Sequence, residues 1–63
     1  MKFKLEIDLN NAAFADGMES ELARILIKAA HELKPNGASL RDINGNRVGR
    51  FFFTDDNGKE SIL

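Results

Sequence analysis

The stretch ASLRDINGNRVGRFFFT, residues 38–54, decides the fold because it predicts a β-hairpin. Strand-forming residues run from 38 to 43 and again from 47 to 54. Between them lies Asn44-Gly45, the kind of dipeptide that most strongly indicates a two-residue hairpin turn, because both residues tolerate a positive φ angle. The sequence therefore predicts two antiparallel strands joined at this turn.

The register of the hairpin determines which side chains are buried, and two registers are compatible with the sequence. A two-residue turn pairs Leu40 with Gly49 and puts two phenylalanines, Phe51 and Phe53, on the face of Leu40. A three-residue loop with Gly45 left-handed moves the partner strand by one place and pairs Leu40 with Val48. We favour the first register because it buries the two phenylalanines together.

Before the hairpin, the N-terminal segment predicts another strand. Residues 2–9 alternate between charged and apolar side chains, and the apolar set is Phe3, Leu5, Ile7 and Leu9. Asn10-Asn11 then break the strand, because asparagine side chains bond to nearby backbone groups. Residues 12–15 suit a single helical turn.

The middle of the chain predicts the main helix. We expect it to begin at Asp16, an N-cap candidate that Glu19 completes as a capping box, and to end by Lys34, just before Pro35. An apolar stripe along it is expected to cover the sheet, and the stripe consists of Leu22, Ile25, Leu26, Ala29 and Leu33, with Ala30 beside them. The expected polar side carries Glu21, Arg24, Lys28, His31 and Glu32.

These elements predict one α+β domain spanning residues 1–63, with a single helix on one face of a three-stranded antiparallel sheet. The order along the chain is β-α-β-β and the order in the sheet is 1-3-2, since the central place suits the phenylalanine-rich strand and makes every neighbour antiparallel. Residues 1–54 form the core. Residues 55–63 begin with the turn Asp55-Asp56-Asn57-Gly58 and then either fray or add a short fourth strand through Ile62 and Leu63.

Composition narrows the possible partners. Nine Lys or Arg residues against ten Asp or Glu give a net charge of −1, so no overall field attracts nucleic acid. The chain has no cysteine, which favours a reducing compartment and leaves no thiolate for a metal. The opening residues are not continuously apolar, so we expect neither a signal peptide nor a membrane segment, and we expect a cytoplasmic protein.

The sequence carries no pattern of catalytic residues. Its one histidine, His31, falls on the expected polar side of the helix. Asp55-Asp56-Asn57-Gly58 lacks the ligand spacing of a calcium loop and is better explained as a turn. We therefore expect no enzyme activity, no metal and no cofactor.

Three blocks of the chain together resemble small, mostly uncharacterised proteins encoded by bacteriophages and prophages. The blocks are NNAAF at 10–14, ELARIL at 21–26 and LRDINGNRVG at 40–49, of which the third is the most specific. The likeness covers residues 3–53 and carries no catalytic or ligand-binding residues. It implies a phage accessory protein that acts in the cytoplasm of a bacterial host, where many such proteins bind and block host machinery, anti-CRISPR proteins among them.

The sheet face away from the helix is the feature that the fold does not explain. In the favoured register it carries Phe52, Arg50, Val48, Arg41, Lys2 and Lys4. An aromatic side chain among arginines is typical of a protein interface, so we expect this face to bind a host or phage protein. The alternative is that Phe52 is an isolated exposed residue or lies under the C-terminal tail.

Two other functions compete with this hypothesis. Phe52 as a stacking platform and the basic residues as a track predict weak binding of single-stranded nucleic acid. Homodimerisation through the same sheet face or through the outer strand edges would add burial that a chain of 63 residues lacks.

Overall fold

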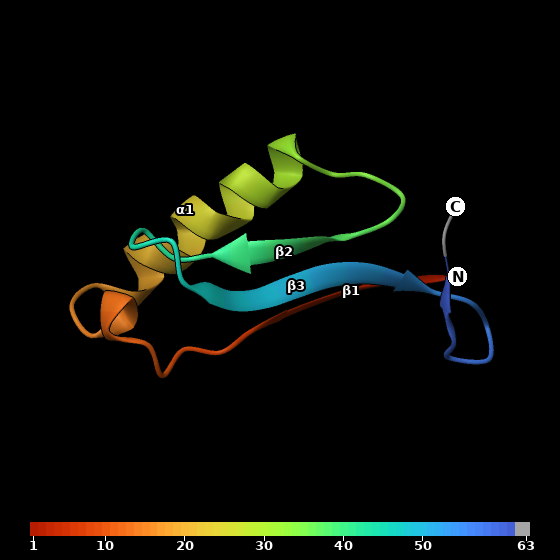
Figure 1. Cartoon of the computed structure of the whole chain (residues 1–63), viewed down its shortest axis with the longest axis horizontal. Coiled ribbons are helices and arrows are strands. Elements are labelled where there is room, and N and C mark those ends of the chain that lie inside the picture. Colours follow the sequence, from red (N-terminus) through yellow and green to blue (C-terminus); the bar gives the residue numbers. More distant parts are fainter. Residues whose placement is uncertain (62–63) are drawn as a thin grey trace.

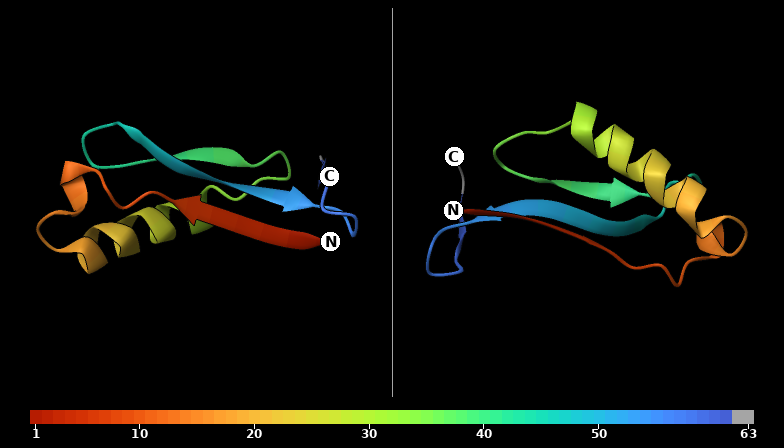
Figure 2. Two further views of the ribbon diagram at one scale, coloured as in Figure 1. Left: turned by 90° about the horizontal axis from the view of Figure 1, so that it is seen from below. Right: turned by 180° about the vertical axis from the view of Figure 1, so that it is seen from behind.

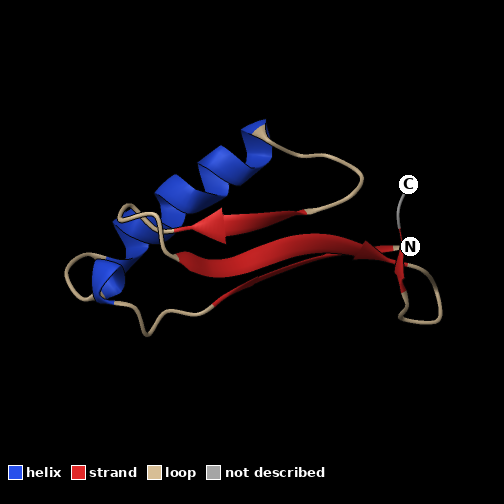
Figure 3. Cartoon of the chain, in the orientation of Figure 1, coloured by secondary structure: helices blue, strands red, loops and turns tan. Residues whose placement is uncertain are grey.

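The computed structural model describes residues 1–61, which form a helix and an antiparallel sheet (Figures 1 and 3). The strands are β1 (Lys2–Ile7), β2 (Ala38–Arg41), β3 (Arg47–Thr54) and β4 (Glu60–Ser61), and the helices are η1 (Ala12–Phe14) and α1 (Met18–His31). The strand order β1-β3-β2 confirms the predicted α+β fold and topology. The predicted continuation through Ile62 and Leu63 lies outside the described residues, while β4 pairs with the end of β3.

The loop of the hairpin follows the three-residue alternative. Asp42 N donates to Asn46 O at 2.9 Å and Gly45 N donates to Asp42 O at 3.0 Å. Gly45 takes the left-handed conformation that this loop requires, with φ at 83°. The carboxylate of Asp42 also accepts hydrogen bonds from the amides of Asn44 and Asn46, which fixes the loop.

Beyond this loop the pairing returns to the favoured register. Arg41 faces Arg47, as the three-residue loop demands, but Leu40 faces Gly49. Val48 is therefore an extra residue in β3 and forms a β-bulge. The bulge turns the Val48 side chain into the core, where it is buried, so its predicted place on the opposite face is wrong.

The core lies between α1, η1 and the sheet. Its buried members are Phe14, Ile25, Ala29, Leu40, Val48 and Phe51, and the partly buried Leu5, Ile7, Leu9 and Ala38 pack against them. The alternating residues of β1 thus face the helix side, as predicted, although the regular strand ends at Ile7 and not at Leu9.

The start of α1 differs from the prediction. The N-cap position is Gly17 and not Asp16, and no side chain caps the helix there. Gly17 adopts φ 84°, a left-handed conformation that glycine reaches without steric cost. This conformation lets the chain turn sharply from η1 into α1, so the backbone sets the start of the helix and the carboxylate of Asp16 does not.

The helix covers less of the sheet than predicted. Of the expected stripe, Ile25 and Ala29 are buried, whereas Leu26 is 42% exposed and Leu33 is 55% exposed. Phe3 on β1 is 48% exposed for the same reason. Figure 1 shows α1 lying beside β2, and the end of the sheet that carries the N-terminus and β4 extends beyond the helix. Neither helix among residues 1–61 combines the length and apolar character needed to cross a membrane.

Candidate interaction surface

The sheet face away from α1 gathers most of the predicted binding residues, and we call it the charged face. Cross-strand pairs place Lys4 beside Phe52 and Glu6 beside Arg50, while Ser39 also faces Arg50 from β2. Residues directly opposite each other in an antiparallel sheet share a face. The charged face therefore contains Lys2, Lys4, Glu6, Ser39, Arg41, Arg47, Arg50 and Phe52.

Phe52 does not provide the exposed aromatic surface that the sequence predicted. Its side chain is only 8% exposed, and the guanidinium carbon of Arg50 lies 4.0 Å from the ring centroid. Arg50 also forms an ion pair with Glu60 of β4, in which Arg50 Nη2 lies 2.9 Å from Glu60 Oε1. The hydrogen bond between these two side chains raises the pKa of Arg50 and lowers the pKa of Glu60. Phe52 is thus covered by a cation–π contact, and the C-terminal strand holds that contact in place.

Arg47 belongs to the charged face and was missed by sequence reasoning. It lies directly opposite Arg41, and the side chains of both are exposed. Arg41 donates a hydrogen bond to the carbonyl oxygen of Gly45 at 3.0 Å, but among residues 1–61 neither guanidinium has a carboxylate partner. The usable signal was the three-residue loop, because its register pairs Arg41 with Arg47 and the favoured two-residue turn does not.

An open depression of about 730 Å³ lies next to these arginines. It is lined by both signs of charge, with Arg47 and Arg50 on one strand and Glu6 and Asp8 at the end of the other. Gly49, which has no side chain, forms part of its wall. The depression is too open and too polar to enclose an apolar small molecule, and its mixed charges suit a polar protein surface.

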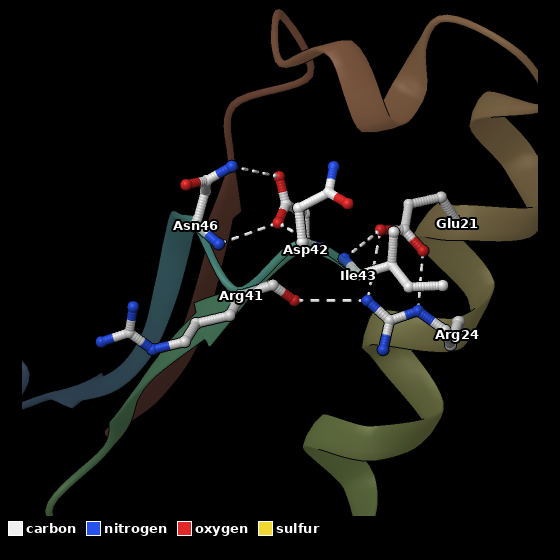
Figure 4. Close-up of polar contacts among 7 residues, drawn as sticks. Glu21, Arg24, Arg41, Asp42, Ile43 and Asn46 are labelled. Atoms are coloured by element: carbon white, nitrogen blue, oxygen red, sulfur yellow. Dashed lines mark hydrogen bonds and ion pairs between the residues drawn. The ribbon is translucent and has the colours of Figure 1, made fainter.

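A network of polar contacts fixes α1 to the hairpin loop (Figure 4). The Glu21 carboxylate accepts hydrogen bonds from Arg24 Nε at 2.7 Å and from the Ile43 amide at 2.8 Å. Arg24 Nη2 in turn donates to the Arg41 carbonyl oxygen at 3.4 Å. Glu21 is buried, so its predicted place on the polar side of the helix is wrong. The bond from Arg24 is the main reason that the pKa of Glu21 lies below its usual value, against the effect of burial.

This network explains the exposed leucines on the other flank of α1. Glu21 and Arg24 lie on the flank of the helix that faces β2, whereas Leu22 and Leu26 fall on the opposite flank at helical spacing. Leu33 follows beyond the end of α1 and is 55% exposed. Phe3 and Leu5 of β1 lie on the same, helix side of the sheet. We call these five residues the apolar flank.

The titratable residues do not converge on a reaction centre. His31 is exposed at the end of α1, as predicted, and Asp55 caps its own turn by accepting from the amides of Asn57 and Lys59. Within residues 1–61, no three His, Asp or Glu side chains lie close enough together to hold a metal ion.

Comparison of the chain with protein-family models, with curated proteins and with solved structures finds no match. The two surfaces therefore have to be interpreted from their own chemistry.

Proposed function

We propose that the chain is a non-enzymatic binding protein that attaches to an acidic patch of another protein through its charged face. The supporting observation is the facing pair of Arg41 and Arg47, which has no carboxylate partner within residues 1–61. Like charges directly opposite each other destabilise a sheet. A local arrangement that costs stability is typical of a functional site, and an acidic partner would remove the repulsion.

A protein partner fits this face better than nucleic acid. Carboxylates at Glu6, Asp8 and Glu60 interrupt the basic residues, so no continuous track exists for a phosphate backbone. The aromatic ring that could stack on a base is covered by Arg50. Alternating charges of both signs instead favour a partner surface with the complementary pattern, since such patterns select one protein among many.

The resemblance to small phage and prophage proteins supports an activity in the cytoplasm of a bacterial host. The partner would then be a host or phage protein. Inhibition of a host defence system, as by an anti-CRISPR protein, is one role that a small binding protein of this kind would fill, because covering a partner's surface requires no chemistry.

Capture from host cells tests the proposal with substitutions at Arg47. A tagged chain expressed in a bacterial host is expected to retain a defined protein, and Arg47→Glu is expected to lose it because the substitution reverses a central charge. Lys34→Glu is the matched control, since Lys34 is exposed in the loop between α1 and β2 and does not belong to the charged face. Arg47→Glu also replaces the repulsive pair by an attractive one, so the variant should fold at least as stably as the original chain.

Two outcomes would contradict the proposal. Equal capture by Arg47→Glu and by Lys34→Glu would show that the charged face does not bind the partner. Loss of the captured protein after nuclease treatment would show that nucleic acid mediates the contact.

A further inference from the structure

The outer edge of β1 is open to a further strand. Within residues 1–61, β1 pairs with β3 alone, and β4 pairs with β3 on the side away from β1, so β1 forms one edge of the sheet. The left view of Figure 2 looks onto this edge, and β1 is seen there along its whole length. An edge strand presents a row of amides and carbonyl oxygens that another strand can bind.

The ladder between β1 and β3 fixes which backbone groups of β1 point outward. Asp8 N donates to Val48 O at 2.7 Å, so the even-numbered residues of β1 bond to β3. Residues of an antiparallel strand bond to a given neighbour alternately. The odd-numbered residues Phe3, Leu5 and Ile7 therefore direct their amides and carbonyl oxygens toward the open edge.

The sequence of β1 is complementary to an antiparallel second copy of itself. When Leu5 lies opposite Leu5 of the second copy, Lys4 faces Glu6 and Glu6 faces Lys4. On the other side of the strand, Phe3 faces Ile7 in both directions. The same register joins the outward backbone groups, since the three outward amides of each copy donate to outward carbonyl oxygens of the other. Side chains and backbone thus select the same pairing.

The neighbouring antiparallel registers bring like charges together. Because the outward groups alternate, the register can change only in steps that keep odd residues opposite odd residues. One step places Lys4 opposite Lys4 of the second copy, and the opposite step places Glu6 opposite Glu6. Like charges directly opposite each other destabilise a sheet, and lysines on an edge strand are a common protection against pairing with unrelated strands. A second copy overcomes that protection because it brings its own glutamate.

This pairing supplies contacts that a single chain lacks. Among residues 1–61, neither Lys4 nor Glu6 forms an ion pair. In the new ladder both occupy non-hydrogen-bonded positions, where facing side chains are closest. On the helix side, the ring of Phe3 is 48% exposed and would pack against Ile7 of the second copy.

We propose that two copies of the chain form a symmetric dimer by pairing β1 with β1, antiparallel, about a twofold axis at Leu5. The two sheets become one continuous sheet, with both helices on one side and both charged faces on the other. This dimer gives a definite register to the strand-edge self-association expected from the sequence. It does not depend on the acidic partner proposed above, because the facing pair of Arg41 and Arg47 belongs to β2 and β3.

Sedimentation equilibrium from about 1 µM to about 1 mM tests the proposal with charge reversals on β1. The original chain is expected to shift from monomer to dimer with rising concentration. Lys4→Glu should raise the dissociation constant about 25-fold, since two symmetric pairs change from attraction to repulsion and each contributes about fivefold. Lys34→Glu is the matched control, because it makes the same change of charge in the exposed loop between α1 and β2. It should dimerise like the original chain.

Mixing two variants tests the register. Glu6→Lys alone should weaken the dimer as Lys4→Glu does. An equimolar mixture of the two variants should dimerise again, because each glutamate of one chain then faces a lysine of the other. Amide hydrogen exchange of the original chain is an independent measurement that needs no variant. The amides of Phe3, Leu5 and Ile7 should exchange slowly only at concentrations at which the dimer forms.

Three results would overturn the proposal. The first is a chain that stays monomeric at about 1 mM. The second is equal weakening by Lys4→Glu and Lys34→Glu, or a mixture of the two β1 variants that stays monomeric. The third is exchange at the three outward amides that does not slow with rising concentration.

Discussion

Replacing Gly49 with alanine tests how closely β1 must approach β3. A Cβ atom at this position would lie 1.9 Å from the Glu6 carbonyl oxygen and 2.9 Å from Ile7 Cα. Both are backbone atoms, so no change of side-chain rotamer relieves the overlap. Because ordinary contact begins at 3.4 Å, the two strands would have to separate by about 1.5 Å at this point.

The separation translates into lost hydrogen bonds. A backbone bond of about 2.9 Å would lengthen to about 4.4 Å, well beyond the usual limit of about 3.2 Å. The bonds on either side of Gly49 are affected, among them the one from Asp8 N to Val48 O at 2.7 Å. With two or three bonds at about 1 kcal/mol each, Gly49→Ala should lower the free energy of unfolding by about 2–3 kcal/mol. This loss is roughly half of the total free energy of unfolding, about 5 kcal/mol, that is expected for so small a chain.

Urea unfolding followed by far-ultraviolet circular dichroism measures this loss. The control is Gly58→Ala, because Gly58 also carries a positive φ, 85°, but a Cβ there meets no atom within 4 Å. Gly58→Ala should lower the free energy of unfolding by only about 1 kcal/mol, the cost of holding an alanine at a positive φ angle. If Gly49→Ala unfolds at the same urea concentration as the original chain, or later than Gly58→Ala, the argument for a tight β1–β3 approach is wrong.

Two further predictions concern buried contacts. The bond from Arg24 keeps the pKa of Glu21 below its ordinary value of 4.5, so this carboxylate stabilises the fold above that pH and stops doing so as the pH falls toward the lowered pKa. Thermal unfolding of Glu21→Gln should therefore depend less on pH below about 4.5 than that of the original chain, and an unchanged dependence would contradict the assignment. Phe52→Ala should lower the free energy of unfolding by about 3 kcal/mol in urea unfolding, whereas an exposed phenylalanine would lose well under half of that.

Much of the fold could be predicted because its determinants are local. The alternation in residues 2–9 and the Asn44-Gly45 turn depend on nearest neighbours in the chain, and both lie in the expected elements. The strand order followed from one global argument, that the most apolar strand occupies the centre of the sheet. These inferences needed only periodicity and turn chemistry.

The errors at Glu21 and Phe52 have a different origin, since each depends on a contact between distant residues. The bulge that buries Val48 was indicated by Gly49, because a glycine inside a strand often marks a bulge or a close backbone approach. The burial of Glu21 had no local signal, since its partner is the amide of Ile43 on the hairpin loop. Likewise, the guanidinium of Arg50 covers the Phe52 ring, and the ion pair that holds it there joins β3 to Glu60 on β4.

The tie between α1 and the hairpin loop affects both the charged face and the apolar flank. Because Glu21 binds the Ile43 amide and Arg24 reaches the Arg41 carbonyl oxygen, the helix is held at the β2 side and is kept from moving toward β1. The same contacts that fix the loop next to the charged face therefore leave the apolar flank uncovered.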